Sequence, residues 1–214
     1  MKRIIIFALA VMTAVLCCSC SSDSNKAEDT TVPENGVTYE YSEEDPSKKT
    51  AAVVYENGVE VSRDNYQYEE DGNIKTVQTV KDGKTVKTTT YEYEGGVNTK
   101  VITEFTDDGV ACKEVAEMDN GRIASITYFE DGEKTGKVLY SYDDDGNMIR
   151  EETVDDDGNV ISHKENTYDN FGKLVRVDCY EFGSLSLSYE YAYKDGVISA
   201  TKCYDSKGNL LWEK

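Results

Sequence analysis

Few residues of this chain have the types and spacing that catalysis or metal binding requires. His163 is the only histidine among the 214 residues, and Ser162 and Lys164 flank it in a segment of strand-like composition. A Ser-His-Asp triad would have to use this histidine, but the sequence contains no Gly-x-Ser-x-Gly nucleophile elbow. It also lacks the two spaced cysteine pairs of a structural zinc site. We therefore expect His163 to be a surface or packing residue, and the protein to be no enzyme and to need no cofactor or metal.

One segment, 141–152, partly matches a calcium-binding loop. At the third, fifth, sixth and twelfth places of an EF-hand loop it has Asp143, Asp145, Gly146 and Glu152. The first place is Ser141 instead of aspartate, and no helix is predicted on either side. We therefore expect that the acidic turns form no high-affinity calcium site.

The N-terminal cysteines have a different chemical context. Lys2 and Arg3 precede an apolar stretch at 4–16, and the sequence Cys-Cys-Ser-Cys follows at 17–20. An apolar stretch of 13 residues is too short to span a membrane and is typical of an export signal.

This leader resembles a bacterial lipoprotein signal, in which the cysteine that ends the lipobox is acylated and becomes the mature N-terminus. The resemblance implies a signal peptide at 1–19 and a lipid on Cys20, with Cys18 as the alternative. Cys17 or an ordinary cleaved signal are further alternatives. The protein would then lie in the cell envelope, anchored to a bacterial membrane by its N-terminal lipid and facing outside the cytoplasm.

Residues 20–36 form a polar, acidic segment without apolar periodicity. Such a segment cannot bury enough apolar surface to fold by itself. We interpret it as a disordered acidic tether that connects the anchor to a folded domain at 37–214.

The chain is strongly acidic, with a formal net charge of −19. Removal of residues 1–19 takes away two basic residues and no acidic one, which leaves 21 basic against 42 acidic residues and a charge of −21. A surface of this charge repels nucleic-acid phosphates, and no basic stripe interrupts it. We therefore expect no nucleic acid among the partners.

The elements that must position any functional side chain follow from the glycines. Thirteen of them, from Gly58 to Gly208, recur at intervals of 11 to 14 residues, which makes a repeating two-part unit of about 25 residues. Asn or Asp precedes nine of the thirteen, and both residue types tolerate the positive φ of tight hairpin turns. A large apolar residue always lies three or four positions before the glycine, so we expect two loop lengths.

The segments between these glycines have the composition of strands. The clearest one has five large residues that alternate with small or polar ones and so share a face: Leu185, Leu187, Tyr189, Tyr191 and Tyr193. The least clear one is 110–118, whose composition would also allow a helix, but the glycine spacing continues through it. Two weaker strands, 37–41 and 50–55, precede the regular array.

Turns this short join only neighbouring antiparallel strands. The predicted fold is therefore all-β: an antiparallel up-and-down meander of about 13 to 15 strands, built from tandem β-hairpin repeats of about 25 residues. Open sheets of this width tend to curl or split. We expect a strongly curved sheet or a flattened barrel, with some element covering its aromatic face.

Three further cysteines, Cys112, Cys179 and Cys203, lie in this array, and export would permit disulfides. In a meander the strand at 185–193 separates Cys179 from Cys203. Their Cα atoms should then be about 10 Å apart, beyond the roughly 7 Å limit for a disulfide. We expect three free thiols.

Three segments share the pattern Tyr-Asp-x-x-Gly followed by an aliphatic residue: 142–149, 168–174 and 204–210. They resemble the YD repeats of Rhs-type surface proteins, in which long antiparallel strands build a curving shell. A second resemblance, to MORN-like hairpin repeats of the YwqK type, rests on units such as Tyr55-Glu56-Asn57-Gly58. The first resemblance implies the architecture only, because this chain is too short for a full shell and has no visible toxin domain.

The remaining function classes are binding and mechanical ones. We expect a binding or adhesive module for a surface glycan or a protein, because tyrosine gives a large contact area at low entropic cost. The candidate binding residues are Tyr189, Tyr191 and Tyr193. The second resemblance and the acidity favour instead an immunity or antitoxin-like inhibitor. A passive spacer, in which these tyrosines only pack, is the third alternative.

Overall fold

The computed structural model describes residues 32–214. The predicted signal peptide at 1–19, the acylation candidates Cys18 and Cys20, and the predicted tether up to residue 31 lie outside the described residues. No helix among the described residues is long and apolar enough to cross a membrane.

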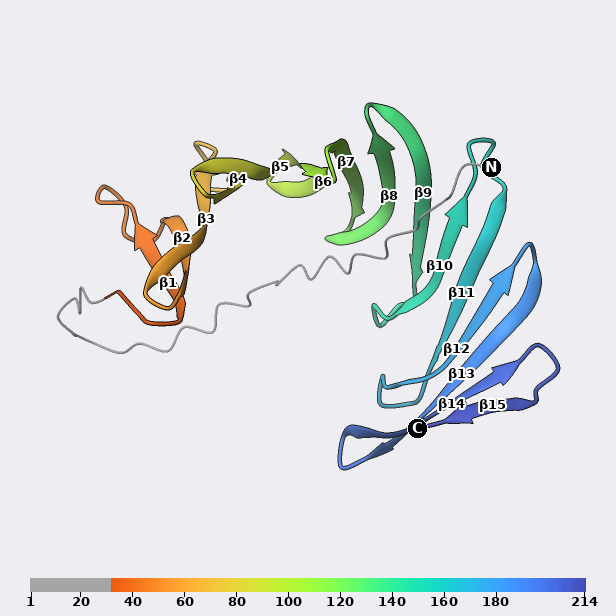
Figure 1. The fold of residues 1–214 in the computed structure, drawn as a ribbon. Helices are drawn as coiled ribbons and strands as arrows, with labels where there is room; N and C mark the ends of the chain where they lie inside the picture. The colour runs from red at the N-terminus through yellow and green to blue at the C-terminus, as the bar shows by residue number, and fades with distance from the viewer. Residues whose placement is uncertain (1–31) are drawn as a thin grey trace.

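Within residues 32–214, fifteen antiparallel strands form one sheet whose spatial order follows the chain order (Figure 1). The strands are β1 Gly36–Tyr41, β2 Lys49–Glu56, β3 Val59–Tyr68, β4 Ile74–Lys81, β5 Lys84–Glu94, β6 Val97–Asp107, β7 Val110–Asp119, β8 Arg122–Glu130, β9 Glu133–Tyr142, β10 Met148–Val154, β11 Val160–Tyr168, β12 Leu174–Glu181, β13 Ser184–Lys194, β14 Val197–Asp205 and β15 Leu210–Glu213. The predicted all-β meander is confirmed, and the ambiguous segment at 110–118 is a strand.

The sheet is a single open layer. Among residues 32–214, each strand contacts only the strand before it and the strand after it, so β1 and β15 are the two edges of this sheet and lie far apart in Figure 1. The flattened barrel was therefore the wrong alternative, and no element of residues 32–214 covers either face. Strand twist explains the open form, because it accumulates over fifteen strands and turns the two ends of the sheet away from each other. The buried side chains are correspondingly few and mostly small: Ala51, Val53, Ser125, Ile126, Val138, Val154, Val177, Ser188 and Cys203.

Eight of the described hairpins close with a two-residue turn in which both residues have positive φ. Asn or Asp occupies the first turn position in six of them, with φ between 46° and 53°. These are primed turns, whose twist matches that of the flanking strands. Gly95 takes the first position between β5 and β6. The eighth turn, between β12 and β13, has Phe182 there at φ 47°.

The other five glycine hairpins have a longer loop in which the glycine is fourth, as in Asp155–Asn159. The Oδ1 atom of Asp155 accepts the backbone N–H of Asp157 at 3.0 Å and that of Asn159 at 2.8 Å. Equivalent bonds fold the loops that begin at Asp169 and Asp205. The Asp of the Tyr-Asp-x-x-Gly pattern is thus a turn-forming residue.

The two spacings between apolar residue and glycine correspond to these two loop lengths, with one exception. Phe105 lies four residues before Gly109, yet β6 and β7 are joined by a two-residue turn. This hairpin is regular, whereas the other hairpins contain a register shift that absorbs one residue. A missing bulge therefore explains the longer spacing.

Candidate functional site

One face of the sheet collects the tyrosines that lie away from the turns. Cross-strand partners share a face, so the strand register defines this face across the whole sheet. It carries Tyr39, Tyr66, Tyr91, Tyr128, Tyr140, Tyr189, Tyr191 and Trp212. We call it the tyrosine face. Because each strand contacts only its sheet neighbours, the tyrosine face has no cover from residues 32–214.

A second group of tyrosines lies on the same face at the ends of odd-numbered strands. The hydroxyl of Tyr193 donates a hydrogen bond to the carbonyl of Leu174 at 2.9 Å, and Leu174 is the cross-strand partner of Tyr168. Four more such bonds, of 2.7 to 3.0 Å, join Tyr68, Tyr93, Tyr142 and Tyr168 to the carbonyls of Lys49, Ile74, Ile123 and Met148. These five edge tyrosines each tie one repeat to the preceding one. On β7, Met118 takes the equivalent place.

Five tyrosines in the middle of their strands, which we call the mid-strand tyrosines, differ from the edge tyrosines in their hydroxyl groups. No hydrogen bond to another described residue involves the hydroxyls of Tyr66, Tyr91, Tyr128, Tyr140 and Tyr191. Burial against neighbouring side chains raises the pKa of each of these phenols, and nearby acidic or phenolic groups raise it further. At neutral pH these hydroxyls are therefore protonated and can donate hydrogen bonds.

The three tyrosines predicted from sequence share the tyrosine face, but they do not share a role. Tyr189, Tyr191 and Tyr193 are all half-buried on β13. Tyr193 is an edge tyrosine, and Lys173 lies over its ring at 5.3 Å. Tyr189 contacts Trp212, with ring centroids 6.2 Å apart and a tilt of 55°. Tyr193 thus uses its hydroxyl to join two repeats, whereas Tyr189 packs against Trp212.

Two glutamates lie beside tyrosine rings at the centre of the tyrosine face. Glu114 is the cross-strand partner of Tyr128, and Glu151 is that of Tyr140. Burial raises the pKa of Glu114, and Lys87 opposes this effect only in part. Glu151 is held by Lys164, whose Nζ lies 2.8 Å from its Oε1. This part of the face therefore offers both phenolic donors and carboxylate acceptors.

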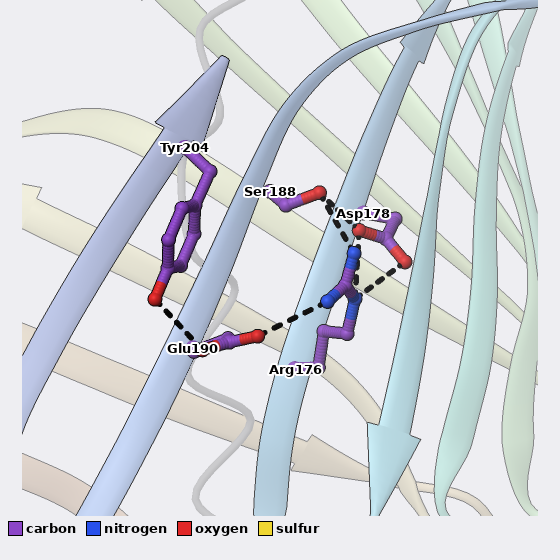
Figure 2. A network of polar contacts seen from close by, with 5 residues as sticks. All are labelled: Arg176, Asp178, Ser188, Glu190 and Tyr204. Carbon is purple, nitrogen blue, oxygen red and sulfur yellow. Dashed lines mark hydrogen bonds and ion pairs between the residues drawn. The ribbon is translucent and has the colours of Figure 1, made fainter. Parts of the chain in front are cut away.

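The opposite face carries a network of charged side chains on β12, β13 and β14 (Figure 2). Arg176 donates to Asp178 at 2.9 and 3.0 Å and to Glu190 at 3.1 Å. Tyr204 donates to the other oxygen of Glu190 at 3.0 Å, and Ser188 bonds to Asp178. Although burial opposes ionisation, the bonds from Arg176 and Ser188 hold the pKa of Asp178 below its usual range. These groups satisfy one another, so we assign them to the stability of the sheet.

His163 lies on this opposite face and is a packing residue. Its ring stacks on Tyr180 with centroids 4.3 Å apart and planes 6° from parallel. Its Nε2 lies 3.6 Å from Oε1 of Glu165, and 10% of the side chain is exposed. Its Nδ1 is buried without a hydrogen bond in the described part of the chain. The sequence placed this residue in a strand but could not reveal its stacking partner.

The segment 141–152 consists of the end of β9, a loop and the start of β10. Asp143 directs its two oxygens at Asn147, accepting from the backbone N–H at 2.8 Å and from Nδ2 at 3.0 Å. Both carboxylate oxygens of Asp143 therefore accept hydrogen bonds that stabilise the turn. Across residues 32–214, no group of three or more His, Cys, Asp or Glu side chains could hold a metal ion.

Cys112, Cys179 and Cys203 are free thiols in the structure. Cys179 pairs with Leu187 and Cys203 pairs with Tyr189, so β13 lies between the two cysteines as the meander requires. Cys203 is buried on the tyrosine face, whereas Cys179 and Cys112 are half-buried.

The fold and this surface define an open, single-layer β-hairpin repeat protein. No family model and no curated protein sequence match the chain. Among solved structures, the chain is similar to that of the TcdB2-TccC3-Cdc42 crystal structure, at 13% identity and a TM-score of 0.47 over 78% of this chain. TcdB2-TccC3 without its hypervariable C-terminal region gives 14% identity and a TM-score of 0.47 over the same share. This chain spans 9% of the length of either.

A porin-like protein from Bacteroides uniformis is similar at 12% identity and a TM-score of 0.42, over 81% of this chain and 84% of that protein. At these identities and scores, none of the three similarities defines a shared function.

Proposed function

We propose that this chain is a non-catalytic binding module that captures its ligand on the tyrosine face. The observation that supports this proposal most directly is the contrast between the edge tyrosines and the mid-strand tyrosines. The edge tyrosines use their hydroxyls to join the repeats, whereas five mid-strand tyrosines keep theirs unbonded among the described residues. A sheet that needed rings only for packing would be served equally well by phenylalanine at the mid-strand positions.

The chemistry of the tyrosine face suits a polar ligand with flat or weakly apolar surfaces, such as a glycan or a protein segment. Half-buried rings supply contact area, and their hydroxyls donate hydrogen bonds. Glu114 and Glu151 supply acceptors beside Tyr128 and Tyr140. The formal charge of −19 disfavours nucleic acids and other polyanions.

A lipid anchor would place this surface in the cell envelope. The charged and apolar leader that ends in Cys20, with Cys18 as the alternative, supports this location. The intact mass of the membrane fraction should contain the increment of an acylated N-terminal cysteine. A triple Cys17, Cys18 and Cys20 to serine variant should be released from the membrane, and an unmodified wild-type protein would rule the anchor out.

The Tyr-Asp-x-x-Gly segments support an architectural relation to the YD-repeat proteins of the Rhs type. In the three segments with this pattern, the Asp carboxylate accepts backbone N–H groups of its own loop. This relation concerns architecture.

The test is retention of the full-length chain on immobilised envelope extract and purified polysaccharides of the producing cell. The variant Tyr140→Ala with Tyr191→Ala should lose retention. The matched control is Tyr180→Ala, which truncates a ring on the opposite face and should keep it. Equal loss in both variants would contradict the assignment to the tyrosine face, and no retention of the wild type would favour a passive spacer.

A further inference from the structure

The two edge strands of the sheet formed by residues 32–214 are not equally protected against pairing. β15 has four residues, ends in Glu213 and is followed by Lys214, and short charged strands resist edge-to-edge pairing. β1 has six residues and carries no lysine and no proline. Its only charged side chain, Glu40, is bound to Arg63 at 2.7 Å. Within residues 32–214, nothing pairs with the outer side of β1, at the left of Figure 1.

Three side chains of β1 point to the tyrosine face and are half exposed. Val37, Tyr39 and Tyr41 have exposed fractions of 50%, 50% and 53%. They alternate with Thr38 and Glu40, so the alternation of large and polar residues is the same in both directions about Tyr39. Such a sequence is complementary to itself when two copies run antiparallel.

The odd number of strands decides the symmetry of any edge-to-edge pair. In an antiparallel meander of fifteen strands, β1 and β15 run in the same direction. Head-to-tail pairing of β15 with β1 would be parallel and would leave the assembly open-ended, whereas β1 against β1 is antiparallel and closes as a two-fold dimer. The rest of the sheet uses only the antiparallel arrangement.

We propose that β1 is a dimerisation edge whose occupant is β1 of a second copy of this chain. Tyr39 lies opposite Tyr39 of the second copy, and Val37 lies opposite Tyr41. Thr38 lies opposite Glu40, so no like charges meet across the pair. The two-fold axis is perpendicular to the sheet, and the tyrosine faces of both copies therefore form one continuous surface. This inference holds whether or not that surface binds a ligand.

Sedimentation velocity of the full-length chain in detergent micelles, over a concentration series, tests the proposal. The wild type should form a dimer, and Tyr39→Lys should weaken it by about tenfold or more because like charges then face each other. Leu211→Lys places the same charge on β15 and should leave the dimer unchanged. A wild type that stays monomeric, or a dimer that Leu211→Lys disrupts and Tyr39→Lys does not, would overturn it.

A second variant separates dimerisation from folding. Residues directly opposite in an antiparallel pair have Cα atoms about 4.5 to 5.5 Å apart, within reach of a disulfide. Tyr39→Cys should therefore form a 39-to-39 disulfide on mild oxidation, and Leu211→Cys should form no 211-to-211 linkage. Non-reducing peptide mapping identifies the link, and its absence in a folded Tyr39→Cys protein would refute the pairing.

Discussion

Tyr191 and Tyr193 lie two residues apart on the same strand and the same face, yet only Tyr193 has a hydrogen-bonded hydroxyl. That hydroxyl reaches the carbonyl of Leu174 at 2.9 Å, 19 residues earlier in the chain. The hydroxyl of Tyr191 has no such partner among the described residues. Tyr193 therefore joins two repeats, whereas Tyr191 makes no such bond among the described residues.

Removal of these two hydroxyls should have different effects on stability. Tyr193→Phe leaves the partly buried carbonyl of Leu174 without its donor, and we expect a loss of about 1 kcal/mol in the free energy of unfolding. Tyr191→Phe should change it by less than about half that amount. Urea unfolding followed by circular dichroism measures both values, and equal losses would show that the two tyrosines have the same role.

On β7, Met118 takes the place of an edge tyrosine, and a substitution there can introduce the hydrogen bond between repeats. Met118 pairs with Ile123, whose carbonyl accepts the hydrogen bond of Tyr142. By the same geometry, Met118→Tyr would donate to the carbonyl of Asn98, the cross-strand partner of Tyr93. We expect a gain of about 0.5 to 1.5 kcal/mol, which Met118→Phe should not reproduce. An identical effect of both substitutions would show that ring packing alone is responsible.

Phe182 is a bulky residue in a backbone conformation that suits Asn, Asp or Gly. Its φ is 47° and its side chain is 81% exposed, so no packing compensates for the strain. Phe182→Asn should raise the free energy of unfolding by about 1 kcal/mol. The reciprocal substitution in the equivalent turn, Asp195→Phe, should lower it. A destabilised Phe182→Asn protein would mean that the ring contributes to folding.

The acidic loops should make the protein sensitive to acid. Hydrogen bonds from asparagine side chains lower the pKa of Asp143, Asp155 and Asp205. A lowered folded-state pKa gives stability that is present above the unfolded value, near about 4, and is lost as the pH falls through the folded value. Asp143→Asn should therefore flatten the acid side of the stability profile.

The sequence predicted most of the fold because the turns are local. Asn-Gly and Asp-Gly pairs need only their own backbone geometry, so the hairpins and their order could be inferred without knowledge of the contacts. Strand faces were harder to predict, because the register shift in most hairpins changes which residues share a face. Tyr180 and Tyr193 hold the same position relative to a glycine, yet they lie on opposite faces.

The candidate site was predictable only in part. Period-two alternation placed Tyr189, Tyr191 and Tyr193 on one face of β13. The hydrogen bond from Tyr193 to Leu174 depends on a contact between repeats, which no local pattern encodes. Trp212 joins Tyr189 for the same reason, since β14 separates their strands in the chain and in the sheet.

Tyrosine nitration in producing cells tests the central claim most directly. Tetranitromethane treatment of cells and of the purified full-length chain, followed by peptide mapping, gives the reactivity ratio of each ring. If the tyrosine face holds a ligand, Tyr128, Tyr140 and Tyr191 should be protected in cells, while Tyr180 on the opposite face should react equally in both samples. Equal reactivity of all four rings, or protection of Tyr180 alone, would contradict the proposed binding surface.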